Sequence, residues 1–163
     1  MRVLVMYDSQ FGNTAQIADA IGEGFRGAES PPDVVEVRQV GDVDLEQLTD
    51  WDLLIVGSPT QRLSLTQSMR AFLDRIPRNA LAGMHVAAFD TRFTEEKLAE
   101  LSSFLGWMVR IFGYAADPIA KRLIHKGGEQ VLPPEGFIVE DTEGPLLEGE
   151  LERARAWAGQ LLA

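Results

Sequence analysis

Short, almost continuously apolar runs that end in turn-forming residues constrain the fold of this chain most. The clearest are residues 2–6 and 53–56, and residues 84–89 form a third. A strand that is buried on both faces of a parallel sheet has this composition, because neither face meets water. A further strand is expected at residues 34–37, and a fifth within residues 129–140, with an irregularity at its proline pair. The pattern therefore predicts five strands.

Amphipathic helices separate these strands. Apolar residues recur at helical spacing in Ile17–Phe25, Met69–Ile76 and Leu147–Ala158. The same spacing predicts a long helix that begins at Glu95 and breaks or bends at Asp117–Pro118.

The alternation of strands and helices predicts an α/β fold, a doubly wound parallel sheet with helices on both faces. We expect residues 1–163 to form a single domain, because this length is typical of one. Ligands of such sheets bind outside the carboxyl ends of the strands, where the strand order reverses. The loops after the first, third and fourth strands are therefore the candidate site.

The loop after the first strand has the composition of a phosphate-binding loop. A helix is expected to begin near Asn13, where free backbone N–H groups and the positive end of the helix dipole attract an anion. Ser9 and Thr14 add hydroxyls that can bind phosphate oxygens, and Gly12 lets the backbone close around the anion. The loop contains no lysine or arginine, so dipoles rather than a cation would neutralise the phosphate.

Three other phosphate-binding arrangements do not fit this loop. The Walker loop needs a terminal Gly-Lys-Ser/Thr, and the dinucleotide fingerprint needs three glycines. A cysteine phosphatase needs a thiolate, and the chain has no cysteine. The lack of cysteine also excludes disulfides and thiolate metal sites.

The string from Val5 to Thr14 resembles the FMN-phosphate signature of the flavodoxin family, with Phe11 in place of a usual hydroxyl residue. Residues 57–60, followed by the amphipathic stretch to Ile76, resemble the family's loop that packs on one face of the isoalloxazine ring and contributes to the phosphate site. Residues 87–93 lie where the family binds the ring edge and covers the other face. The resemblance extends over essentially the whole chain, and it implies the strand order 2-1-3-4-5 and one non-covalently bound FMN. The residues implied as cofactor-binding are Ser9, Gln10, Phe11, Gly12, Asn13, Thr14, Ser58, Pro59, Thr60, Gln61, Arg62, Asp90, Thr91, Arg92 and Phe93.

The expected ring contacts depart from the family pattern. Flavodoxins usually place a tryptophan or tyrosine against the ring, whereas here Phe93 is the stacking candidate, with Leu63 or the Arg62 guanidinium on the opposite face. Asp90 is a candidate acceptor for the ring N3–H, and a helix N-cap role for it or for Thr91 is the alternative. Structural roles are expected for the three tryptophans, Trp51, Trp107 and Trp157.

The charge of the chain bounds its partners. It carries 25 acidic and 15 basic residues, a formal net charge of −10. Such a surface repels phosphate backbones and anionic lipid headgroups, so redox partner proteins with basic surfaces are expected rather than nucleic acid or membrane. Residues 1–7 lack the basic region and cleavage site of a signal peptide, so we expect a cytoplasmic protein.

Three functions stay open at this point. The leading hypothesis is an FMN-containing electron carrier, and the alternatives are an FMN-dependent NAD(P)H oxidoreductase acting on quinones or small acceptors and a non-enzymatic sensor or interaction domain. No titratable pair indicates acid–base catalysis, and neither a metal site nor a particular oligomeric state is predicted. A phospho-receiver domain is excluded, because it needs paired acidic residues after the first strand, where this chain has only Asp8.

Overall fold

The computed structural model describes residues 1–61 and 64–163, with the backbone alone at residues 109–112. The strands are β1 (Arg2–Tyr7), β2 (Val34–Gln39), β3 (Leu53–Pro59), β4 (His85–Arg92), β5 (Glu129–Gln130) and β6 (Glu135–Ile138). The helices are α1 (Asn13–Arg26), α2 (Gln67–Arg75), α3 (Glu95–Leu101), α4 (Ser103–Phe112), α5 (Ala116–His125) and α6 (Glu150–Leu161), with the 3₁₀ helices η1 (Val40–Asp42) and η2 (Leu45–Asp50). None of these helices is long and apolar enough to cross a membrane.

The strands form one parallel sheet in the order β2-β1-β3-β4-β5, and β6 also pairs with β4. The predicted order is confirmed, with β5 and β6 sharing the fifth position. Between the last pair of β5 and the first pair of β6, residues 87–88 of β4 face the four residues 131–134. Two of these four are prolines, which have no N–H to donate to the ladder, so the strand is interrupted there as expected.

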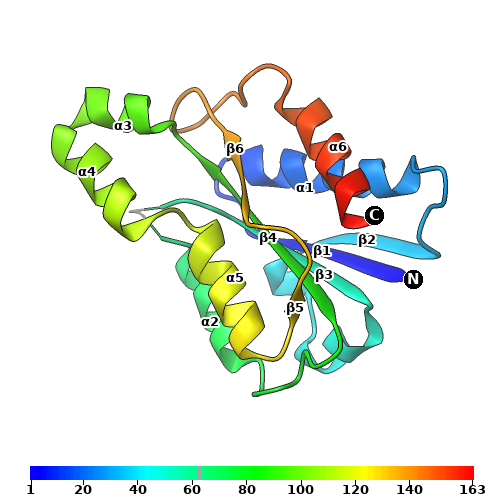
Figure 1. The fold of residues 1–163 in the computed structure, drawn as a ribbon. Helices are drawn as coiled ribbons and strands as arrows, with labels where there is room; N and C mark the ends of the chain where they lie inside the picture. Colours follow the sequence, from blue (N-terminus) through cyan, green and yellow to red (C-terminus); the bar gives the residue numbers. More distant parts are fainter. Residues whose placement is uncertain (62–63) are drawn as a thin grey trace.

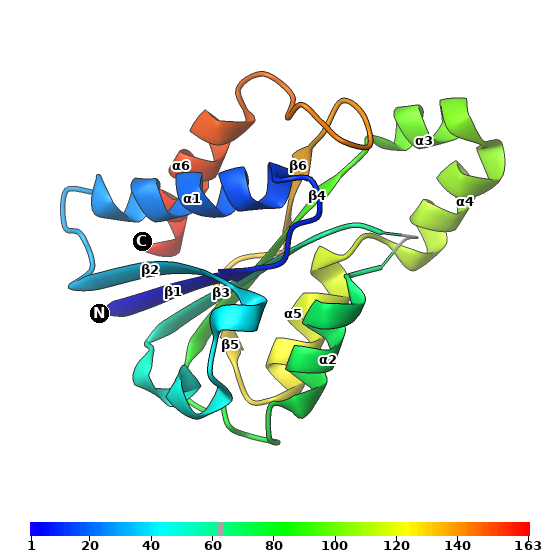
Figure 2. The ribbon, with the colours of Figure 1, turned by 180° about the vertical axis from the view of Figure 1, so that it is seen from behind.

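Helices α1 and α6 cover one face of the sheet, and α2 and α5 cover the other (Figures 1 and 2). The side chains of β1 divide between the two faces. Val3 and Val5 pack in the same cluster as Ile17 of α1, whereas Leu4 and Met6 belong to the core on the opposite face. All five side chains are fully buried, which is why the strand reads as a continuous apolar run.

The long helix predicted after β4 is wrong in its boundaries. Ser102 is extended, with φ −166° and ψ 128°, and it separates α3 from α4. Asp117–Pro118 does not bend a helix but lies in the first turn of α5. Proline is tolerated there, because the first N–H groups of a helix have no intrahelical acceptor.

Helices α3 and α4 form an arm, residues 95–112, that extends from the carboxyl end of β4 and lies apart from the two helical layers (Figures 1 and 2). Leu98 and Leu105 attach the arm to Phe93 and Tyr114 in a small separate cluster. The arm is therefore fastened next to the carboxyl edge of the sheet, through a residue of the loop after β4.

The prediction that all three tryptophans are structural is wrong for one of them. Trp51 and Trp157 are buried, but Trp107 is 53% exposed and stacks on the exposed Phe104, with 5.9 Å between ring centroids. The apolar spacing within residues 95–112 does indicate helices. That spacing does not indicate which side of α4 faces solvent. The side that carries Trp107 is exposed because neither helical layer packs against it.

Candidate functional site

A cavity of about 700 Å³ opens between the loops that follow β1, β3 and β4. It lies at the carboxyl edge of the sheet, where ligands of this fold class bind. Its lining residues are Ser9, Gln10, Phe11, Asn13, Thr14, Pro59, Thr60, Gln61, Ser64, Leu65, Gln67, Arg70, Thr91, Arg92, Phe93, Val139 and Thr142.

Eleven of the fifteen residues predicted to contact a cofactor line this cavity, and they come from all three loops. Of the other four, Gly12, Ser58 and Asp90 do not line it. Arg62 lies outside the described residues, as does the stacking candidate Leu63. The structure thus brings the three predicted loops together, while contact of their residues with a cofactor stays a prediction.

The start of α1 presents backbone N–H groups to the cavity. Gly12 precedes the helix with φ 90°, a left-handed backbone conformation that residues with a Cβ atom rarely adopt. Its own N–H donates to Ser9 Oγ at 3.1 Å. The N–H groups of Phe11, Asn13 and Thr14 donate to no residue in the described part of the chain. Unpartnered N–H groups and the positive end of a helix dipole are features that attract an anion, so the predicted phosphate-binding role of this loop stays a prediction.

Hydroxyl groups tie the loops around the cavity to one another. The Oγ1 atoms of Thr14 and Thr91 lie 2.8 Å apart in a buried hydrogen bond, which joins the start of α1 to the end of β4. The N–H of Thr60 donates to the Thr91 carbonyl at 2.9 Å, and its Oγ1 accepts from the N–H of Ala115 at 3.0 Å. The loop after β3 is thereby fixed both to β4 and to the residue before α5.

Ser58 is fully buried and serves the loop rather than the cavity. Its Oγ accepts from the Thr66 N–H at 3.0 Å and donates to the Pro59 carbonyl at 3.1 Å. Thr66 caps α2 and donates its hydroxyl to Asp8 Oδ2 at 2.6 Å. These bonds hold the first turn of α2 beside the residue that opens the first loop.

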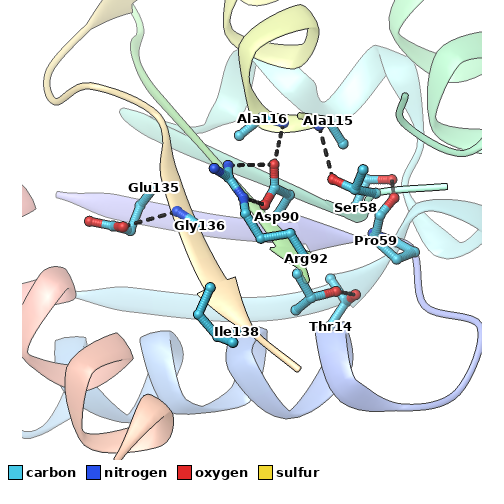
Figure 3. A network of polar contacts seen from close by, with 12 residues as sticks. Thr14, Ser58, Pro59, Asp90, Arg92, Ala115, Ala116, Glu135, Gly136 and Ile138 are labelled. Atoms are coloured by element: carbon cyan, nitrogen blue, oxygen red, sulfur yellow. Dashed lines mark hydrogen bonds and ion pairs between the residues drawn. The ribbon is translucent and has the colours of Figure 1, made fainter. Parts of the chain in front are cut away.

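The buried carboxylate of Asp90 and the partly exposed guanidinium of Arg92, a lining residue, form an ion pair at the cavity wall, shown in Figure 3. Arg92 donates from Nε to Oδ1 at 2.5 Å and from its terminal nitrogen to Oδ2 at 2.7 Å. The Ala116 N–H, at the start of α5, donates to the same carboxylate at 2.8 Å. The guanidinium lies 3.8 Å from the Tyr114 ring centroid and packs on Gly136, where an added Cβ would lie 2.3 Å from its central carbon. The pair therefore joins β4, β6 and α5.

Both oxygens of the Asp90 carboxylate already accept hydrogen bonds within the protein, so a bond from a flavin ring N3–H to Asp90 stays a prediction. Its side chain is completely buried, and burial raises its pKa while Arg92 and the Ala116 N–H oppose that rise. The alternative that Asp90 or Thr91 caps the next helix is wrong, since Thr94 caps α3 by accepting from the Lys97 N–H. Asp90 instead accepts the first N–H of α5, a helix that begins 26 residues later in the chain.

Six lining residues are not among the residues predicted to bind the cofactor. Arg70 follows Thr66 by four residues, so both lie on one side of α2, but nothing local marks that side as a cavity wall. Val139 and Thr142 follow β6, and the loop they belong to packs over α1, where a Cβ on Gly144 would lie 2.6 Å from Asn13 Oδ1. The six are Ser64, Leu65, Gln67, Arg70, Val139 and Thr142.

Solved structures share this fold over its whole length. Oxidised Flavodoxin 1 from Bacillus cereus superposes with a TM-score of 0.74, covering 99% of this chain and 97% of its own at 19% identity. A flavodoxin from the domain Archaea gives a TM-score of 0.73 at 23% identity, with 99% and 96% covered.

Sequence comparisons give two kinds of relatives. A flavodoxin from Picosynechococcus sp. is 28% identical over 98% of this chain and 95% of its own length. An NAD(P)H dehydrogenase (quinone) from Paraburkholderia phymatum is 32% identical, but the match covers 63% of this chain and 62% of that enzyme. The family model described as Flavodoxin matches residues 5–157. Because that match takes in nearly the whole chain, including all three loops of the cavity, the chain belongs to the flavodoxin family.

Proposed function

We propose that this chain binds one FMN non-covalently in the cavity and carries electrons between redox partner proteins. The observation that supports the proposal most is the set of N–H groups at Phe11, Asn13 and Thr14, which open toward the cavity without a partner among the described residues. No described lining residue is acidic, although the whole chain has a net charge of −10. An anionic ligand is favoured at such a place.

The residues of the cavity fit FMN in size and in chemistry. Pockets for cofactors measure roughly 300–1,000 Å³, and this cavity falls within that range at about 700 Å³. The N–H groups and the hydroxyls of Ser9 and Thr14 would bind the phosphate at the start of α1. Pro59 and Phe93 line the cavity beyond it, where they would orient an aromatic ring and exclude water from it. The chain has no cysteine, so a covalent link from a thiol to the flavin is excluded.

FMN supplies the electron-accepting and electron-donating chemistry when bound, and the protein supplies orientation and electrostatics. The cavity lies at the edge of the sheet, and the exposed side chain of Phe11 is part of its lining. An acidic surface attracts basic partner proteins over several ångströms and raises their rate of encounter. These features favour a carrier that exchanges electrons with proteins that have basic surfaces.

A second candidate function is the reduction of quinones by NAD(P)H. It is favoured by the 32% identity to an NAD(P)H dehydrogenase (quinone) over 124 residues. The match spans 62% of that enzyme, whereas the flavodoxin relative is matched over 95% of its length. For this reason we rank the carrier first.

The test of FMN binding is a titration of the purified apoprotein with FMN. Quenching of the flavin fluorescence is the signal that reports binding. The proposal predicts saturation at one FMN per chain and a flavin absorbance band that remains after gel filtration. A protein that neither retains FMN nor quenches its fluorescence would contradict the proposal and favour a sensor or interaction domain.

Direct mixing of the FMN-loaded protein with NADPH or NADH separates the two redox functions. A carrier is expected to keep its flavin absorbance on mixing, and to lose it only when a flavoprotein reductase is added. Rapid bleaching by NAD(P)H alone, with reoxidation by a quinone, would instead assign the second function.

A further inference from the structure

The charges that line the cavity differ from those of the whole chain. Among the described lining residues there are two cations, Arg70 and Arg92, and no anion. A single uncompensated charge close to a bound anion changes the free energy of binding, so the partners of each lining arginine matter. Whether each arginine is available to a ligand depends on its own partners.

Arg92 is not available as a free charge. Its guanidinium makes two hydrogen bonds to the buried carboxylate of Asp90 and covers the Tyr114 ring. Its positive charge is compensated inside the protein, so it adds little net charge to the cavity.

Arg70 has no carboxylate partner among the described residues. Within the described part of the chain its guanidinium donates one hydrogen bond, from a terminal nitrogen to the Ser64 hydroxyl at 2.6 Å, and the side chain is exposed. Side chains of a helix point back toward its N-terminus. The guanidinium of Arg70 therefore lies toward the start of α2, on the side of the cavity that Arg70 lines. Among the described residues that line the cavity, Arg70 is therefore the uncompensated cation.

A chain of contacts connects Arg70 with the first loop. Ser64 pairs with Gln61 through two backbone hydrogen bonds, and the Gln61 side-chain amide donates to that of Gln10. At the base of α2, Thr66 is bound to Asp8, the residue before Ser9. The wall that carries Arg70 is thus joined to the loop that presents the anion-binding N–H groups.

We propose that Arg70 recognises a phosphate group of the ligand in this cavity. The inference rests on the proposed function, and the phosphate has two possible sources, the 5′-phosphate of FMN and the diphosphate of a nicotinamide dinucleotide. A guanidinium suits either, because its planar fork can donate two hydrogen bonds to one phosphate.

The first test compares FMN with riboflavin, which lacks the phosphate, on wild type and R70Q. If the FMN phosphate is the partner, R70Q weakens FMN affinity by about tenfold and leaves riboflavin affinity unchanged, as expected for the loss of a charge-assisted hydrogen bond. R70K keeps the positive charge but lacks the planar fork of donors, so its FMN affinity is expected to lie between those of wild type and R70Q. Added salt should weaken FMN binding more in wild type than in R70Q.

Two control variants separate recognition from structure. R75Q removes the same charge from the last turn of the same helix, outside the cavity, and should leave FMN affinity unchanged. S64A removes the hydrogen bond of Arg70 but keeps its charge. If R70Q acted only by loosening the wall, S64A would weaken FMN and riboflavin as R70Q does.

The second test applies where NADPH reduces the FMN-loaded protein directly, as the second candidate function predicts, and it measures the apparent dissociation constant of NADPH during that reduction. A dinucleotide source predicts about a tenfold increase in R70Q, with reduction by dithionite unchanged. If R70Q weakens the affinity for FMN or for NADPH but not for riboflavin, the inference is supported. The ligand whose affinity falls is then the source of the phosphate that Arg70 binds. Equal losses for FMN and riboflavin, or no effect on FMN and NADPH, would overturn it. Wild type that binds no flavin would contradict the proposed function itself.

Discussion

The loop after β1 and the segment after β4 face the same cavity but are built in different ways. The first loop presents backbone N–H groups at Phe11, Asn13 and Thr14, shaped by one left-handed glycine. The wall after β4 depends instead on the ion pair of Asp90 and Arg92, whose other contacts lie on α5 and β6. The comparison teaches that one wall of this site is local in sequence and serves the ligand, whereas the other is assembled from distant segments and serves the fold.

The largest effect is expected on the β4 wall. D90A removes the acceptor of three hydrogen bonds and leaves the Arg92 charge uncompensated, so the free energy of unfolding should fall by about 3 kcal/mol. Urea denaturation followed by circular dichroism measures this change. D19A, at an exposed position of α1, is the matched control and should change stability by less than about 0.5 kcal/mol.

The double variant D90A/R92L sharpens this reading. Without the cation, no uncompensated charge stays behind, so part of the stability should return. If the stability losses of D90A and R92L simply add in the double variant, the two residues are not energetically coupled.

The next effect is expected on the first loop, and it should appear mainly in ligand binding. G12V forces a β-branched residue into φ 90°, and the displaced N–H groups should lower FMN affinity by about 2 kcal/mol, or roughly thirtyfold. A fluorescence titration measures this. G41V is the control, because an added Cβ meets nothing within 4 Å at either glycine, and only Gly12 has a positive φ. Equal affinities of G12V and wild type would refute the role assigned to the loop.

The support of the β4 wall by β6 should depend on pH. Burial raises the pKa of Glu150, but hydrogen bonds from Arg153 and from the Ile138 N–H outweigh it, so the pKa lies below its usual 4.5. A carboxylate with a lowered pKa stabilises the folded state above the unfolded value, and this stability is lost as the pH falls through the folded value. E150Q should therefore cost about 1–2 kcal/mol at pH 7 and progressively less below pH 4.5.

Denaturation of wild type and E150Q at several pH values tests that dependence. E148Q, at an exposed position in the turn before α6, should show no such difference. A gap between E150Q and wild type that stays constant from pH 7 to pH 3 would contradict the assignment.

The smallest effect concerns a hydrogen bond that joins the two walls directly. The Thr14 and Thr91 hydroxyls lie 2.8 Å apart and buried, and T14V, T91V and the double variant form a cycle. A coupling energy of about 1 kcal/mol is expected for a buried neutral hydrogen bond. Additive losses would show that the two walls are energetically independent.

Much of the fold was predictable because its signals are local. The strand order, the faces of α1 and the start of the first helix at Asn13 follow from apolar spacing, turn residues and a family resemblance confined to short motifs. The same is true of the interruption in the fifth strand, which its two prolines cause.

The errors fall where the structure depends on contacts distant in sequence. The contacts of Asp90 depend on Ala116, which lies far from it in the sequence. Trp107 is exposed because neither of the two helical layers lies next to α4. Arg70 enters the cavity because α2 is fixed beside the first loop through Thr66. No spacing within a single element encodes such neighbours.

The most direct test of the central claim follows the backbone N–H resonances of the first loop during addition of FMN, in ¹⁵N-labelled protein. The account predicts that the N–H signals of Phe11, Asn13 and Thr14 move strongly downfield, as expected for hydrogen bonds to a charged acceptor. It also predicts that riboflavin does not reproduce these shifts. Saturable FMN binding that leaves the three signals unmoved would contradict the claim that this loop holds the phosphate.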